Sequence, residues 1–192
     1  HVGLGNVEYV VKTLVVDCAN ATDRWDILAI PGVEITHVPK DDIDLVARTA
    51  KELGAKLVTV HGETIVEPVE PGTNEAAVRS AFVDVLAHPG LISYEVARLA
   101  AENGVYLEVS ARKGHSLTNG HVVNLARQVG ASTVLDSDAH EPNDLLTLDL
   151  IEKIAEGAGL NKEEAHALLE TNPQNLLVKL GFGPVPASDS SP

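Results

Sequence analysis

The chain contains no methionine, a single cysteine, few aromatic residues and few basic residues for its length of 192 residues. The single cysteine excludes a disulfide within the chain. No apolar run approaches the ~18 residues of a membrane-spanning helix and no signal-peptide pattern is present, so we expect a cytoplasmic protein without a membrane partner. The net charge of −14 argues against nucleic acid as the main partner, but it is compatible with a small phosphorylated molecule.

The sequence instead repeats a pattern in which a short apolar run precedes a stretch with helical periodicity. The runs are Ile27–Ile30, Lys56–Val60, Phe82–Ala87, Val105–Val109 and Ser132–Leu135. Alternating strands and helices predict an α/β fold of the parallel-barrel type. Because the carboxyl ends of barrel strands meet on one face, we expect the polar residues that follow these runs to form one site there.

The missing methionine also means that the sequence opens on His1 without an initiator. A complete barrel has about 250 residues, so we expect an N-terminal segment with further strands to be absent from this sequence. The apolar content of 44% is sufficient for one globular domain over residues 1–182. Residues 183–192, with Pro, Ser and Asp, are expected to form a flexible tail.

Helical periodicity and capping residues define the expected helices. We place them at residues 6–21, 40–53, 74–81, 93–103, 121–129, 144–157, 161–171 and 173–180. Ser93 and Asn161 are the clearest N-caps, and Gly54 and Gly104 are expected to end their helices. The acidic, proline-rich segment 62–73 is expected to be a long loop at the functional face. Cys18 lies on an apolar stripe of the first helix and is expected in the core.

Asp138 and His140 form the sharpest single motif. Residues two apart on an extended strand point to the same side, so both side chains could hold one metal or bridge two. Asp136 shares that side one step deeper along the strand. The alternative is a strand end whose aspartate only caps the next helix.

His61 and His88 each follow an apolar run directly. Neutral imidazole is the commonest metal ligand among side chains, and Glu34 after the first run offers a carboxylate. One such histidine alone is more often a core residue, whereas two in phase with Glu34 favour a metal site. His37, His121 and His166 are weaker candidates, expected respectively in a loop, at a helix start and on a helix surface.

Arg112, Lys113 and His115 follow the fourth apolar run. Cationic side chains at the functional face could bind a substrate phosphate through charge-assisted hydrogen bonds. The alternative is an ordinary solvated loop.

Six segments of the chain together resemble the PHP family, named for the polymerase and histidinol phosphatase domain. They are Pro31-Gly32-Val33-Glu34-Ile35, Val60-His61-Gly62-Glu63, Leu86-Ala87-His88-Pro89-Gly90, Leu107-Glu108-Val109-Ser110, Ser137-Asp138-Ala139-His140 and Asn172-Pro173-Gln174-Asn175-Leu176-Leu177. The resemblance spans nearly the whole chain in family order. It implies a distorted (β/α)7 TIM-like barrel with up to three divalent metals, such as zinc, manganese or iron. The metal ligands it implies are His1, Glu34, His61, His88, Asp138 and His140.

The family's opening His-x-Asp-x-His motif is absent, so the metal cluster of this chain is expected to lack some ligands. We expect a phosphoesterase that hydrolyses a small phosphorylated substrate through a metal-activated hydroxide. Asp138, His140 and Arg112 are the expected catalytic residues, and Arg112, Lys113 and His115 the expected substrate-binding ones. Two alternatives stay open: a hydrolase of C–N bonds, and a metal-binding or regulatory domain without catalysis.

Overall fold

The computed structural model describes residues 1–183 and contains a parallel sheet. Its strands are β1 (Gly32–Ile35), β2 (Leu57–His61), β3 (Val85–Ala87), β4 (Tyr106–Ser110) and β5 (Thr133–Asp136), hydrogen-bonded in chain order. The α/β class with parallel strands is therefore confirmed. The expected flexible tail lies almost wholly outside the described residues.

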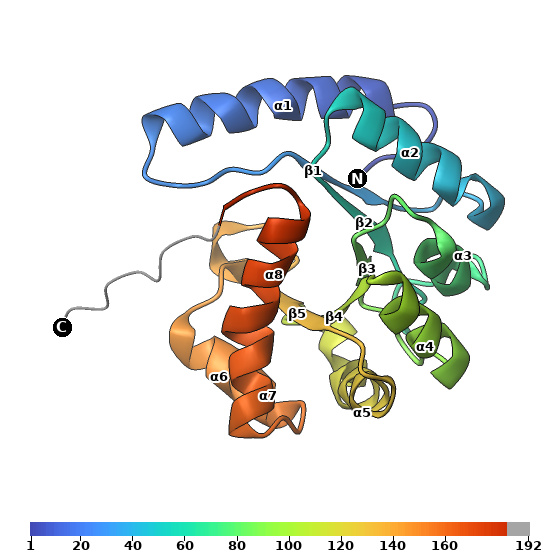
Figure 1. The fold of residues 1–192 in the computed structure, drawn as a ribbon, viewed down its shortest axis with the longest axis vertical. Coiled ribbons are helices and arrows are strands. Elements are labelled where there is room, and N and C mark those ends of the chain that lie inside the picture. The colour runs from blue at the N-terminus through green and yellow to red at the C-terminus, as the bar shows by residue number, and fades with distance from the viewer. Residues whose placement is uncertain (184–192) are drawn as a thin grey trace.

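Eight α-helices follow or join the strands in the described part of the chain (Figure 1). They are α1 (Val7–Arg24), α2 (Ile43–Leu53), α3 (Thr73–Arg79), α4 (Tyr94–Asn103), α5 (Asn119–Val129), α6 (Leu148–Gly157), α7 (Lys162–His166) and α8 (Asn172–Lys179). Figure 1 shows α1 to α5 around one side of the sheet and α6 to α8 beyond β5. In the described residues, no helix combines the length and apolar character needed to cross a membrane.

The register of the sheet separates an apolar outer face from a polar inner face. Ile35, Val60, Leu86 and Leu107 are aligned across four strands, and all are buried against the helices in the main core. Because side chains alternate along a strand, each neighbour of these residues faces the other side. The chain therefore places Glu34, His61 and Glu108 on the inner face, at or near the carboxyl ends of their strands.

A smaller apolar cluster fills the lower part of the inner face. Val85, Tyr106 and Val134 are buried there and pack with Leu57 and with Leu176 of α8. The last helix therefore covers part of the face on which the polar residues lie. Farther along the same face the apolar side chains give way to histidines and carboxylates.

Several predicted helix ends are confirmed by the backbone. Ser93 Oγ accepts a hydrogen bond from Val96 N, and Asn161 forms a capping box with Glu164. Gly54 and Gly104 end α2 and α4 with φ of 112° and 66°, a conformation that favours glycine. The segment between β2 and α3 is a loop, as predicted.

Three local predictions were wrong. The run Ile27–Ile30 is not a strand: Ile27 and Leu28 are exposed, and pairing with β2 starts only at Gly32, after Pro31. The helix predicted at residues 144–157 begins at Leu148, where the Thr147 side chain accepts a hydrogen bond from Leu150 N, and Asp144 belongs to a separate 3₁₀ turn at Pro142–Asp144. Cys18 is only half-buried and lies outside the core cluster.

The two edges of the sheet are β1 and β5. Val2 forms an isolated parallel bridge with Ile35, so the start of the chain runs beside the β1 edge. Among residues 1–183, β1 and β5 do not pair with each other, and the structure shows an open five-stranded sheet.

Candidate metal centre

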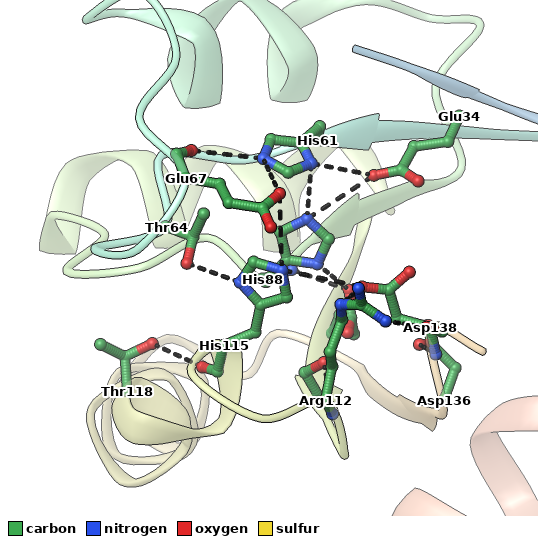
Figure 2. Close-up of polar contacts among 12 residues, drawn as sticks. Glu34, His61, Thr64, Glu67, His88, Arg112, His115, Thr118, Asp136 and Asp138 are labelled. Atoms are coloured by element: carbon green, nitrogen blue, oxygen red, sulfur yellow. Dashed lines mark hydrogen bonds and ion pairs between the residues drawn. The ribbon is translucent and has the colours of Figure 1, made fainter. Parts of the chain in front are cut away.

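Three side chains from neighbouring strands meet at the carboxyl edge of the sheet (Figure 2). Glu34 Oε1 lies 3.2 Å from His61 Nδ1 and 3.6 Å from His88 Nε2, and the two imidazole nitrogens lie 2.9 Å apart. Both histidine side chains are almost fully buried, with exposed fractions of 4% and 2%. The structure thus brings together three of the six metal ligands that the family resemblance implied.

The charges of this group are coupled. Burial acts to raise the pKa of Glu34, but the hydrogen bond with His61 and the charge of His88 outweigh it and lower that pKa. Burial acts to lower the pKa of His61, yet its contacts with Glu34 raise it. Burial and then the neighbouring His61 lower the pKa of His88. The Glu34 carboxylate therefore contacts both imidazoles. The rings of His61 and His88 do not readily carry a positive charge at the same time.

Glu108 of β4 contacts the His88 side of the Glu34, His61 and His88 group. Its Oε2 accepts a hydrogen bond from His88 N at 2.8 Å and lies 3.0 Å from His88 Nδ1. A carboxylate on one imidazole nitrogen fixes the ring and leaves the other nitrogen free for a metal. Sequence reasoning gave Glu108 no role, although an acidic residue between Leu107 and Val109 in an apolar strand was the available signal.

Glu108 and the half-buried Asp136 form an acidic pair next to this group. Burial raises the pKa of Glu108 to about 7. Burial and then the adjacent Glu108 raise the pKa of Asp136 to about 8. Both carboxyl groups therefore hold a proton more readily than an exposed carboxyl group does.

Asp138 lies next to the first group and contacts residues of the loop after β4. Its Oδ2 is 3.3 Å from Arg112 Nε and 3.7 Å from His115 Nε2. His88, His115 and Asp138 form a second set whose donor atoms all lie within 4.8 Å of one another. Burial and then the charge of His88 lower the pKa of His115.

His1 and His140 lie at the rim of the site rather than inside it. His1 Nε2 is 3.1 Å from Glu34 Oε2, and the His1 side chain is 53% exposed. His140 Nδ1 contacts Arg112 Nη1 at 2.8 Å, and its ring centre is 5.8 Å from that of His1. Both rings are therefore near the centre: one nitrogen of His1 contacts Glu34, and one nitrogen of His140 contacts Arg112.

The backbone at the site is constrained. His88 and Asp138 have φ of 28° and 45°, values that are uncommon for residues with a side chain. Gly90 must be glycine because a Cβ there would lie 2.0 Å from the carbonyl oxygen of Glu63. Such close packing of the segments after β2 and β3 holds His61 and His88 against each other.

A cavity of about 540 Å³ opens beside this centre. Arg112, Lys113 and His140 contribute to its wall, together with Glu67, Asp144 and other residues of the 141–150 segment. Two of the three predicted phosphate-binding residues therefore face one cavity. His115 is buried and does not line it.

The remaining histidines lie where the sequence placed them. His37 is an exposed loop residue whose ring centre lies 6.0 Å from that of His61. His121 is in the first turn of α5, where Nε2 contacts the Ile92 carbonyl oxygen at 2.7 Å. His166 is exposed at the end of α7.

The donor set fits a divalent metal. Ligands about 2.1 Å from a tetrahedral ion lie about 3.4 Å apart, which is close to the separations among Glu34, His61 and His88. Imidazole nitrogen combined with carboxylate oxygen is a donor set for zinc, iron or manganese. The residues therefore could hold at least one metal ion.

Comparisons with known proteins find relatives that cover most of the chain. The chain is 41% identical over 181 residues to the uncharacterized protein MJ1295 of Methanocaldococcus jannaschii, covering 94% of this chain and 83% of that protein. The chain belongs to the same protein family as MJ1295. It is also 31% identical to ribonuclease P protein component 3 of Methanosarcina acetivorans, over 84% of this chain and 74% of that protein. No family model matches the sequence.

Further relatives are named as probable phosphatases. A probable phosphatase of Shewanella sp. is 32% identical over 130 residues, which are 58% of this chain and 50% of that protein. The matched region thus spans about half the length of that relative.

Solved structures support the fold alone. A chain in archaeal ribonuclease P bound to mature tRNA aligns with a TM-score of 0.65 at 19% identity, covering 88% of this chain and 74% of that one. An amidohydrolase crystal structure aligns with a TM-score of 0.63 at 18% identity, covering 92% of this chain and 47% of that one.

Proposed function

We propose that this protein is a metal-dependent phosphoesterase of the PHP type that hydrolyses a small phosphorylated molecule. The observation that carries the proposal is the convergence of Glu34, His61 and His88, with donor atoms 2.9 to 3.6 Å apart. The names of the probable phosphatase relatives support the same reaction class. Residues 1–182 would form one domain of a distorted seven-stranded barrel, of which five strands are described.

Zinc, manganese or iron would be held by Glu34, His61 and His88, with Asp138, His1 and His140 as further ligands. Up to three ions are proposed. When bound, such ions supply Lewis acidity, which lowers the pKa of water and neutralises charge on a phosphoryl group. Glu108 keeps the His88 ring in place throughout, because it binds the ring and the backbone amide of the same residue.

The cavity beside the centre is the proposed substrate site. Arg112 and Lys113 would hold the phosphate oxygens by charge-assisted hydrogen bonds. Arg112 already contacts Asp138 and His140, so it joins the cavity wall to the metal centre. Asp138 or His140 would pass the proton released by the attacking water to the leaving alkoxide oxygen.

A nucleic-acid-associated role is the second candidate. The relation to ribonuclease P protein component 3 favours it. The net charge of −14 opposes it, because binding a phosphate backbone is driven by basic side chains. The C–N hydrolase alternative has only a fold similarity in its favour.

The proposal is tested by the activity of the full chain on a generic aryl phosphate with added manganese or zinc. We expect metal-dependent hydrolysis, and we expect Asp138→Asn to reduce it roughly a hundredfold or more, by analogy with other disrupted preorganised sites. Asparagine keeps the volume and tolerates the positive φ of this position, so the melting temperature should stay close to that of the metal-free parent protein. Hydrolysis of an aryl amide but not the phosphate, or RNA binding without hydrolysis, would favour one of the alternatives.

A further inference from the structure

His115 differs from the cationic residues that precede it in the sequence. Its side chain is 2% exposed, whereas Lys113 is exposed and Arg112 is 29% exposed. It starts a short 3₁₀ turn at His115–Thr118, which directs the ring inward, and Thr118 Oγ1 donates to its carbonyl oxygen. A buried imidazole needs polar partners at both nitrogens.

One nitrogen of this ring is held by Thr64. Thr64 Oγ1 lies 2.8 Å from His115 Nδ1, and Thr64 itself is buried in the loop between β2 and α3. A partner on Nδ1 fixes the orientation of the ring and directs Nε2 away from it. Glu108 has the same relation to His88, so two histidines of the site are oriented in the same way.

The other nitrogen faces carboxylates. His115 Nε2 lies 3.7 Å from Asp138 Oδ2 and 4.0 Å from Glu67 Oε2, neither within hydrogen-bonding distance. The His115 ring stacks on that of His88, with centres 4.1 Å apart and an angle of 12° between the planes. Figure 2 shows these side chains turned toward one another beside the Glu34 and His61 group.

We propose that His115 and Asp138 bind a second divalent metal beside the one assigned to Glu34, His61 and His88, with Thr64 as the positioning residue. This inference rests on the proposed function and changes the role of His115 from phosphate contact to metal ligand. Glu67 would approach as a further oxygen donor from the loop, since its Oε2 lies equally far, at 4.0 Å, from His61 and His115. The adjacent Arg112 then joins the second metal to the phosphate cavity through Asp138.

The test is direct metal binding by the full chain, without substrate. Manganese alone is titrated by calorimetry, and bound metal is counted by elemental analysis for the parent protein, His115→Gln, Thr64→Val and the control His166→Gln. We expect His115→Gln to lose about one equivalent of metal, while Thr64→Val weakens the same equivalent roughly 10- to 100-fold. His166→Gln, on the exposed end of α7, should bind as the parent does.

A parent protein that binds no metal would overturn the proposed function itself, whereas a parent that binds metal with His115→Gln unchanged would overturn only this inference. His115→Gln that keeps all its metal but loses affinity for inorganic phosphate would return His115 to the phosphate site. If His115→Gln does not fold, Thr64→Val decides, because unchanged metal affinity in that variant contradicts a role for His115 as an oriented ligand.

Discussion

Two neighbouring regions at one edge of the sheet are built differently. Glu34, His61 and His88 come from strands or their immediate ends, and the two histidines are buried. Arg112, Lys113 and His140 come from loops and face a cavity. Residues on or directly after strands are positioned by backbone pairing with neighbouring strands, whereas loop residues depend on a few side-chain contacts. The buried group is therefore suited to hold an ion in fixed geometry, and the loop group to contact substrates.

The largest expected effect is at the centre of the buried group. Replacing His88 with Gln removes the one histidine that both candidate metal sets contain and leaves Glu108 facing an amide. We expect metal-dependent phosphatase activity to fall at least about a hundredfold. Elemental analysis should show loss of bound metal, with His166→Gln as the control. Full activity in His88→Gln would break the distinction between the two regions.

A smaller effect is expected at Glu108, which contacts the proposed ligand His88. Glu108→Gln keeps the side-chain shape but weakens the contact with His88 Nδ1, so metal affinity should fall roughly 10- to 100-fold. Metal titration followed by calorimetry measures this change. Activity at saturating metal should then return largely to the parent value. An affinity equal to that of the parent would mean that the Glu108 contact is structural only.

The loop region should respond through the substrate instead. Arg112→Gln is expected to raise KM for an aryl phosphate roughly three- to tenfold, because the half-exposed guanidinium is screened by water. Bound metal should be unchanged, since Arg112 belongs to neither candidate set of metal ligands. Lys113→Gln, in the same cavity wall, should act in the same direction and more weakly. A loss of metal in Arg112→Gln would show that the two regions are not separable.

The smallest effect is expected far from both regions, at an exposed ion pair between α5 and α7. The hydrogen bond from Arg127 and that from Asn161 N lower the pKa of Glu164 to about 2. Because this folded-state pKa is below the unfolded value of about 4.3, the stabilisation is present above that value and is lost as the pH falls toward 2. Urea unfolding of Glu164→Gln should show a small deficit at pH 7 that disappears near pH 2. Phosphatase activity should not change.

The sequence pattern identified most strand ends but not the first one. His61 and His88 follow the apolar runs Lys56–Val60 and Phe82–Ala87. These runs overlap the neighbouring strands β2 and β3. The run Ile27–Ile30 looked equally apolar, but Ile27 and Leu28 are exposed, and the paired strand starts at Gly32. Hydrophobicity alone cannot distinguish an apolar run that pairs in the sheet from one that does not. Pairing depends on whether the backbone groups of the run meet those of a neighbouring strand.

Side-chain chemistry was predictable where it followed strand alternation. Glu34, His61 and His88 were named from the sequence, and the structure brings them together. Glu108 could have been named by the same alternation, since a buried acid in an apolar strand requires a partner. Thr64 could not, because it belongs to a long loop and meets His115 across 51 positions of the chain.

The sequence by itself determined the alternation of strands and helices, the helix ends at Ser93, Asn161, Gly54 and Gly104, and the residue types available to bind a metal. These are local properties of periodicity, capping and side-chain chemistry. Only the tertiary structure decided that His115 is buried beside Asp138 while Arg112 and Lys113 face the cavity. The reason is that burial of a loop side chain depends on packing between distant segments, which local sequence does not specify.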